Sequence, residues 1–252
     1  ANAFIDGQWS AKKLQRLIVT SATYRQSSRS RPELQELDPA NELLARQVRL
    51  RLDGEIIRDA ALASSGLLTR TIGGPSVHPP QPEGVFEFTQ DPKPWDTEAG
   101  ADRYRRGMYT FFWRSSPYPA LMVFDFPNSN VTCTRRVRSN TPLQSLTLAN
   151  DQAFMECARA LAERVLETSA DGDAERVVRA FRLCLARRPS PAEVDRLVRF
   201  LARQRASFRD DPQAARALAG ELATDDDQDA ERAAWIATAR VLLNLDEFIT
   251  RE

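Results

Sequence analysis

Histidine and cysteine are scarce in this chain of 252 residues, and each shortage excludes a class of site. The one histidine, His78, has no partner in the sequence for catalysis. The three cysteines, Cys133, Cys157 and Cys184, form neither a CxxC nor a CxxCH motif, which excludes a zinc site or a covalent haem attachment built from this chain alone. One disulfide with one thiol left over stays open, but Cys157 and Cys184 fall in apolar helical patterns, which favours buried free thiols.

Net charge and long apolar runs are also lacking. With 35 basic and 35 acidic residues, no global field draws the chain to nucleic acid or to an anionic membrane. No run is long enough for a transmembrane helix, no signal peptide opens the chain, and no GxSxG motif marks a nucleophile. Because the chain begins at Ala1 without a methionine, we interpret it as a piece of a longer protein, so the missing targeting signal says nothing about the compartment.

The residues that are present describe a soluble globular protein with enough length for a sizeable core. The chain is 42% hydrophobic and 28% charged, which is ordinary for such proteins. Its basic residues are nearly all arginines, which could indicate bidentate recognition of anions, although a GC-rich coding genome explains the bias more simply. We expect a mainly α-helical single domain over residues 1–252, made of N-terminal helices (1–70), an irregular insert (71–140) and C-terminal helices (141–252).

Helix start and stop signals in the first part predict three helices. Ser10 is a candidate N-cap for a helix to about Ser27 with Leu17 and Ile18 on its buried face. The Asp38-Pro39 pair predicts a second helix, since proline is well tolerated at the first helical position. A third helix is predicted from Asp53 to a stop at Gly66.

The last part shows stronger helix signals. A helix from Thr141-Pro142 to about Glu167 has an apolar stripe that includes Leu146 and Phe154. The segment Ser190-Pro191-Ala192-Glu193 is a capping box, a specific start signal for the next helix. Further helix starts are predicted at Asp173 and Asp211. The acidic run from Asp225 to Asp229 is interpreted as a solvated loop with helix-capping acids. The final helix is predicted to bury Trp235, Ile236, Leu242 and Leu243 in the core.

The insert differs in character from both flanks. Nine of the fifteen prolines lie between Pro75 and Pro127, and a continuous helix cannot persist through that spacing. Met108–Trp113 and Leu121–Phe126 read as strands, which predicts a short β-hairpin or two extended segments laid across helices. The segment Gln81–Ala101 is either a functional loop or a plain connection.

Several long motifs, in order, carry a family resemblance over nearly the whole chain. The chain resembles the C-terminal domain of large planctomycete cytochrome-c-associated surface or secreted proteins of unknown function. The matching runs are LQRLIVTSATYRQSS (14–28), LLARQVRLRLDGEIIRDAALASSGLL (43–68), IGGPSVHPPQP (72–82), RRGMYTFFWR (105–114), FDFPNSNVTCTRRVRSNTPLQSLTLANDQAF (124–154) and LLNLDEFITRE (242–252).

This resemblance implies export from the cytoplasm, to the periplasm, the cell surface or the medium, and a multidomain parent. It implies no cofactor in this chain, because haem c is expected in a separate domain of the parent. It supplies no reaction. Relatives often have a lysine after GGPSV, where this chain has His78.

The insert also holds the main candidate site. Its arginines flank aromatic residues, and arginine forks bind carboxylate, sulfate or phosphate in bidentate fashion. One interpretation is an anionic-polysaccharide cleft with Tyr109, Trp113 and Tyr118 as stacking platforms. The simpler one is that the arginines pair with Asp102, Asp125 and Glu156 and hold the insert to the helices. The arginines concerned are Arg103, Arg105, Arg106, Arg114, Arg135, Arg136 and Arg138.

Four other residues are weaker candidates. Asn140 begins a segment that could present free backbone N–H groups to an anion, although capping is its simpler role. His78 could act as a general base or an external haem ligand. Asp125 and Asn128 could supply oxygens to a calcium site, but an Asx turn around Pro127 explains them with less.

We therefore favour a non-catalytic structural or interaction module that orients the other domains of its parent or binds a partner through the face from Gly73 to Asn140. An enzyme or lectin-like unit for anionic polysaccharide is the alternative. A docking surface for the parent's cytochrome is a third, weaker hypothesis. Neither nucleic acid nor a membrane span is expected among the partners.

Overall fold

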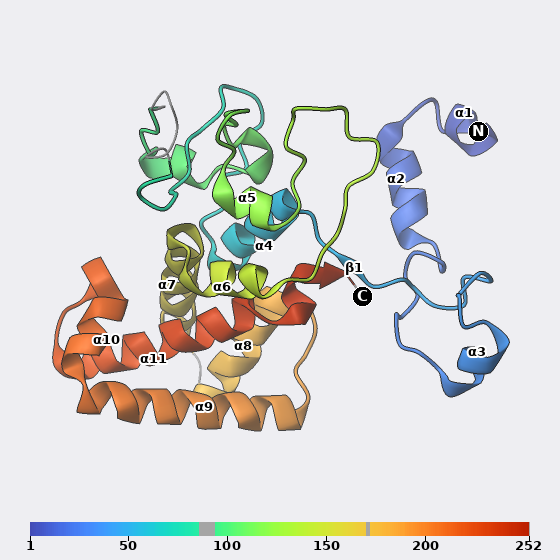
Figure 1. The fold of residues 1–252 in the computed structure, drawn as a ribbon. Coiled ribbons are helices and arrows are strands. Elements are labelled where there is room, and N and C mark those ends of the chain that lie inside the picture. Colours follow the sequence, from blue (N-terminus) through green and yellow to red (C-terminus); the bar gives the residue numbers. More distant parts are fainter. Residues whose placement is uncertain (86–93, 170–171, 252) are drawn as a thin grey trace. The chain divides into compact units, whose positions relative to one another are not determined.

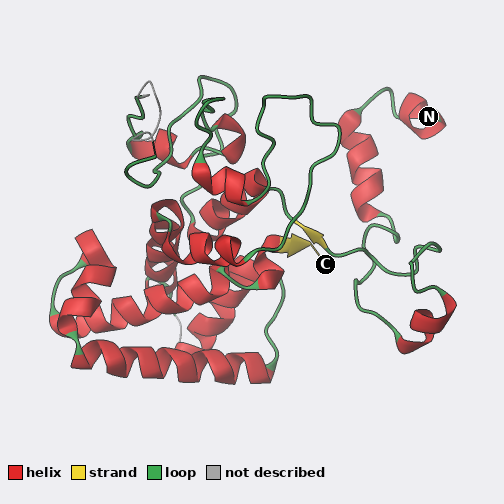
Figure 2. Cartoon of the chain, viewed as in Figure 1, coloured by secondary structure: helices red, strands yellow, loops and turns green. Residues whose placement is uncertain are grey.

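The structure is a computed structural model that describes residues 1–85, 94–169 and 172–251 (Figure 1). It is 56% helical, which confirms the predicted mainly α fold class (Figure 2). Within the described ranges, strand is confined to β1 (Leu50–Arg51) and β2 (Thr250–Arg251), which form a two-stranded sheet. Contacts divide the chain into two compact units, one of residues 1–50 with the end from Thr250 onward and one of residues 51–249. The single domain expected over the whole length stays a prediction.

The first unit contains three short helices: α1 (Asn2–Asp6), α2 (Ala11–Thr20) and α3 (Pro32–Leu37). Helix α2 begins as predicted, because the Ser10 side chain accepts a hydrogen bond from the Lys13 N–H at 3.3 Å. It ends at Thr20, earlier than expected. Its predicted buried face is not buried, since Leu17 is 56% exposed and Ile18 48%.

The prediction of a helix that starts at Asp38 is wrong. Asp38 is instead the C-cap of α3, which ends at Leu37. The Asp38 carboxylate instead accepts backbone hydrogen bonds from Glu42 at 2.8 Å and Leu43 at 3.0 Å, which closes a loop. Asn41 takes a positive φ of 55°, a left-handed conformation that a helix cannot contain.

The second unit is a helical core. Helix α11 (Asp226–Leu243) lies at its centre and packs against α7, α9 and α10, with Trp235 and Ile236 fully buried as predicted. The Trp235 indole N–H donates to Glu231 at 2.9 Å, so the ring is buried without an unpaired donor. The other helices are α4 (Gly54–Ser65), α5 (Pro119–Val123), α6 (Pro142–Asn150), α7 (Gln152–Leu166), α8 (Asp173–Leu185), α9 (Pro191–Asp210) and α10 (Pro212–Ala219), with 3₁₀ turns at Gly100–Tyr104, Gly107–Tyr109, Gly220–Leu222 and Asp246–Ile249.

Most predicted helix boundaries in this unit are confirmed. Helix α4 follows Asp53 and ends at Gly66, whose φ of 86° is the left-handed C-cap that glycine favours. The capping box at Ser190 and Glu193 opens α9, and the Asp211 side chain caps α10. Helix α8 also begins at the expected residue, although its N-cap is Gly172 and not Asp173.

The single helix predicted from Thr141 to Glu167 is two helices. Asp151 has an extended backbone (φ −65°, ψ 137°), so it ends α6, and its side chain accepts from the Ala153 N–H at 2.9 Å, so it caps α7. The break means that Leu146 on α6 and Phe154 on α7 no longer share one helix face. Leu146 is 59% exposed, whereas Phe154 is buried as predicted.

Two further expectations are corrected. The acidic run is the start of α11 and not a loop, and the carboxylate of Asp229 is fully buried, accepting from the Thr224 N–H at 2.8 Å. The predicted capping role is confirmed, because the Asp225 side chain caps α11. The strand predicted at Leu121–Phe126 is helix α5 followed by a turn. Pro119 fixes φ at the first helical position and so starts that helix.

Arg187 connects α9 to the turn after α11 through two carboxylates. Its guanidinium donates to Glu193 at 2.7 Å and to Glu247 at 2.6 Å, and Glu193 also accepts from the Ser190 N–H at 2.7 Å. The hydrogen bonds from Arg187, followed by the one from Ser190, lower the pKa of Glu193 from 4.5 to about 2. The same contacts raise the pKa of Arg187.

We expect the stabilisation from Glu193 to be lost in acid. Its pKa is lower in the folded chain, so its contribution is fully present above pH 4.5 and disappears as the pH falls toward 2. The difference in free energy of unfolding between the wild type and Glu193→Gln should therefore shrink across this window in urea titrations. Glu167→Gln, at an exposed position on the helical unit, is the control and should show no such change. A Glu193→Gln difference that stays constant from pH 6 to pH 2 would contradict the ion pair.

Candidate functional site

The insert is built from two segments that run beside each other. The Val77 N–H donates to the Tyr109 carbonyl and the Phe111 N–H donates to the Val77 carbonyl, both at 2.8 Å. These bonds make an isolated parallel bridge at Val77 and Thr110. The prediction of extended structure at Met108–Trp113 is therefore met in part, after the 3₁₀ turn at Gly107–Tyr109.

Arg105 and Tyr109 shape the glycine turn of the first segment. The Arg105 side chain is buried, and its guanidinium donates to the carbonyls of Gly73 and, at 2.8 Å, Pro75. Its Cζ lies 3.8 Å from the centroid of the Tyr109 ring, and the Tyr109 hydroxyl accepts from the Gly73 N–H at 2.7 Å. Gly74 has a φ of 90°, and a Cβ there would meet the guanidinium at 3.4 Å. These two predicted ligand residues thus hold the backbone of their own chain.

Helix α4 anchors the second segment through Asp59. This carboxylate accepts from the Arg106 Nε at 2.8 Å and from the Gly107 N–H at 2.6 Å. Gly107 lies so close to α4 that an added Cβ would meet the Glu55 Cα at 2.8 Å. The ion pair raises the pKa of Arg106, so this predicted binding residue is already neutralised within the fold.

Three more arginines of the predicted cluster also have carboxylate partners. Arg136 makes a bidentate pair with Glu55, with both hydrogen bonds at 2.8 Å, and Arg138 lies 3.5 Å from Asp53. The Arg103 Nε donates to Glu156 on α7 at 3.0 Å, and this pair raises the pKa of Arg103. Of the three partners predicted for these arginines, Glu156 is confirmed, Asp125 instead binds Ser139, and Asp102 forms no ion pair with a described residue.

Arg114 and Arg135 differ from the other arginines of the cluster. Both are exposed, and neither has a side-chain partner among the described residues. The structure therefore does not gather the seven arginines into one open group, because five of them are bound to the carboxylates and carbonyls of the same chain.

Two aromatic side chains donate hydrogen bonds to the carbonyls of prolines in the first segment. The Tyr118 hydroxyl donates to the Pro80 carbonyl at 2.6 Å, and the Trp95 indole N–H donates to the Pro79 carbonyl at 2.7 Å. The rings of Trp95 and Tyr118 are stacked with centroids 5.7 Å apart. Tyr118 is 1% exposed, and burial raises the pKa of its hydroxyl. It is therefore not an exposed stacking platform.

His78 and Trp113 lie at the edge of this aromatic group. The His78 ring lies 4.8 Å from the Trp95 ring and 4.9 Å from the Phe111 ring, and its Nδ1 lies 3.6 Å from Glu98. Trp113 packs edge-on against Phe111 with centroids 4.9 Å apart. These contacts give His78 a packing role within the insert.

A long loop leaves and rejoins the insert at Asp125 and Ser139. The Asp125 carboxylate accepts from the Ser139 N–H at 2.7 Å and from its hydroxyl at 2.8 Å. Asn128 accepts from the Asn130 N–H at 3.2 Å, which is the predicted Asx turn. Asn140 is exposed, and the N-cap of α6 is Thr141, whose side chain makes no capping bond. The described residues hold no cluster of three or more His, Cys, Asp or Glu side chains placed to bind a metal.

A groove of about 1080 Å³ lies beside α7, and the sequence analysis missed it. Most of its charged lining residues are engaged by the fold: Arg159 donates to the Leu218 carbonyl at 2.9 Å, Arg164 donates to the Ser64 carbonyl at 2.7 Å, and Glu163 pairs with Arg232 at 2.8 Å. The polar face of α7, with charges three to four residues apart, was the available sequence signal.

Fold and site together define a helical domain with a proline-rich insert that is tied down by its own arginines. The chain belongs to the PSD1 family, described as a protein of unknown function (DUF1553), whose model matches residues 1–201. Membership of an uncharacterised domain family is thus confirmed, and the match ends within α9. No curated protein and no solved structure matches the chain. Every helix in the described ranges is too short or too polar to cross a bilayer.

Replacing Asp59 by alanine should loosen the insert. The change leaves the Gly107 N–H and the Arg106 guanidinium without their acceptor, and we expect a loss of about 2 kcal/mol in the free energy of unfolding, measured in urea. Asp195→Ala removes an exposed pair with Arg199 on α9 and should cost less than about 0.5 kcal/mol. Equal effects of the two changes would show that the anchor contributes no more than a surface pair.

The three thiols should differ in reactivity. All are free, with Cys133 exposed, and burial raises the pKa of both Cys157 and Cys184 to about 12. A chromogenic thiol reagent at pH 8 should therefore modify one thiol per native chain, none in Cys133→Ser, and all three thiols of the wild type in denaturant. Fewer than three thiols in denaturant without reductant would reveal a disulfide.

Proposed function

We propose that the chain is a non-catalytic interaction module, with the insert as its rigid contact face. The observation that carries this proposal is the pairing of five insert arginines with acceptors of the same chain. A cleft for anions needs guanidinium groups that are free to exchange water for ligand, and here most of them already hold carboxylates or carbonyls. Such pairing fixes the conformation of the insert and leaves few guanidinium groups free to bind or activate a substrate.

The loop between Asp125 and Ser139 is the part of this face that is best placed to contact a partner. Its base is fixed by Asp125–Ser139 and by Arg136 on Glu55. Its apolar side chains are exposed, with Val131 at 75% and Val137 at 73%. A fixed base with exposed apolar side chains is suited to binding another protein surface.

The partners we propose are the other domains of an exported parent protein. This part of the proposal rests on the resemblance to cytochrome-c-associated proteins, in which haem c belongs to a separate domain. The same resemblance supports our proposal of a location outside the cytoplasm.

The exposed Arg114 and Arg135 keep one alternative testable, namely binding of anionic polysaccharide. The experiment measures binding of the purified chain to sulfated, carboxylated and neutral polysaccharides across salt concentrations, with Arg114→Ala and Arg135→Ala as variants. An interaction module should bind none of them. Saturable binding that weakens with salt and with either substitution, in variants that remain folded, would replace our proposal by the polysaccharide one.

A second arm tests the proposal directly. Val131→Asp and Val137→Asp should weaken binding of the chain to the separately purified remaining domains of its parent at least tenfold. The control is Leu146→Asp on α6, because Leu146 is 59% exposed and lies outside the loop. Val241 on α11 is less suitable, because it is only 36% exposed. Binding that both loop variants retain in full would remove the loop from the contact face.

A further inference from the structure

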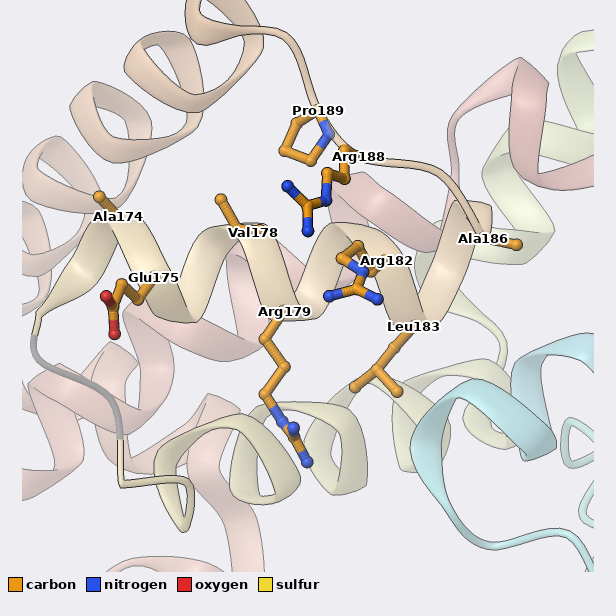
Figure 3. Close-up of a pocket in the computed structure, with 9 residues that line it drawn as sticks. All are labelled: Ala174, Glu175, Val178, Arg179, Arg182, Leu183, Ala186, Arg188 and Pro189. Carbon is orange, nitrogen blue, oxygen red and sulfur yellow. The ribbon is translucent and has the colours of Figure 1, made fainter.

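A second surface of the helical unit has the features of a docking groove. It is an open groove of about 930 Å³ along the outer side of α8 and the segment that follows this helix (Figure 3). Aliphatic side chains line it at Val178, Leu183 and Pro189. Its charged lining residues are three arginines and one glutamate, namely Arg179, Arg182, Arg188 and Glu175.

The three arginines stand out because the described residues offer their guanidinium groups no carboxylate or hydrogen-bond partner. All three are exposed. Neighbouring arginines behave differently: Arg187 is held by two glutamates, and Arg205 is held by Asp173 at 2.9 Å and by a second carboxylate, that of Glu231. Arg187 and Arg205, which do not line the groove, therefore form ion pairs with carboxylates of the described chain, whereas the three arginines that line the groove do not.

We infer that this groove binds an acidic segment of a partner polypeptide, with an apolar side chain seated against Val178 and Pro189, which lie on the same side of α8 (Figure 3), and carboxylates on Arg179, Arg182 and Arg188. Charge complementarity selects the acidic partner, since three exposed cations face one anion. The aliphatic lining selects a polypeptide over a polysaccharide, because no aromatic ring lines the groove to stack on a sugar. The inference gives a partner class to the proposed interaction role and rests on that role.

The probe is a fluorescent 14-residue peptide in which pairs of glutamates alternate with pairs of leucines, titrated against the full chain and followed by anisotropy. Three comparison ligands separate the contributions: an all-glutamate peptide of the same length, a peptide with glutamine in place of glutamate, and dextran sulfate. We expect the glutamate–leucine peptide to bind at least tenfold more tightly than either comparison peptide, with an affinity that falls as salt rises.

The matched variants are Arg179→Glu/Arg182→Glu and, as control, Arg196→Glu/Arg203→Glu. Both reverse two exposed arginines and so change the net charge equally, but the control pair lies on α9 and does not line the groove. The groove variant should lose at least tenfold in affinity and the control less than twofold. Val178→Gln should weaken binding of the glutamate–leucine peptide and leave binding of the all-glutamate peptide unchanged.

Equal losses in the groove and control variants would overturn the inference, because binding would then follow net charge alone. So would a complete lack of binding by the glutamate–leucine peptide, or tighter binding of dextran sulfate that the groove variant abolishes. The proposed function fails separately, when the loop variants leave binding of the parent's other domains intact. Failure at the groove with success at the loop therefore rejects this inference alone.

Discussion

The carboxylates on one side of α4 hold the insert in place. Asp53 precedes this helix, Glu55 lies in its first turn and Asp59 lies near its middle. They bind Arg138, Arg136 and Arg106, which come from two stretches of the insert. The opposite side of α4 packs against α7 with Ile57 and Ala61 fully buried. One short helix therefore joins the irregular half of the unit to its helical core. Negative charge near a helix N-terminus is also favourable in itself, so Asp53 and Glu55 stabilise α4 as well as the insert.

This arrangement explains how a segment with so many prolines and glycines can be ordered without a sheet. Backbone groups that a sheet would pair are instead met by side chains: the carbonyls of Gly73, Pro75, Pro79 and Pro80 accept from Arg105, Trp95 and Tyr118. Proline has no N–H to contribute to a ladder, so bonding to its carbonyls from long side chains is an effective alternative. Arginine and aromatic residues that suggest a binding cleft in the sequence are, for the most part, the internal supports of this segment.

Local signals in the sequence were sufficient for much of the fold. The capping box at Ser190, the cap at Asp211 and the glycine stop at Gly66 act within a few residues, so their outcome could be predicted. The break at Asp151 was missed: an aspartate cap is a local signal, but distant partners also hold α6 at this break. Two carbonyls of α6 accept hydrogen bonds from α11 and the residue after it: Arg240 donates to Ala149 at 3.0 Å and Asn244 donates to Ser145 at 3.1 Å. The carboxylate partners of Arg103, Arg106, Arg136 and Arg138 lie 47 to 85 residues away in the chain, at a range no local pattern reaches.

The central position of α11 sets the order of events during synthesis. The faces of α7 and α9 that bury Leu161 and Leu201 pack against this helix, which leaves the ribosome after all of its neighbours. Until residues 226–243 emerge, the apolar surfaces of these earlier helices have no cover, and uncovered surface of that kind is where nascent chains associate wrongly. The helical unit can therefore complete its core only after its last long helix has emerged.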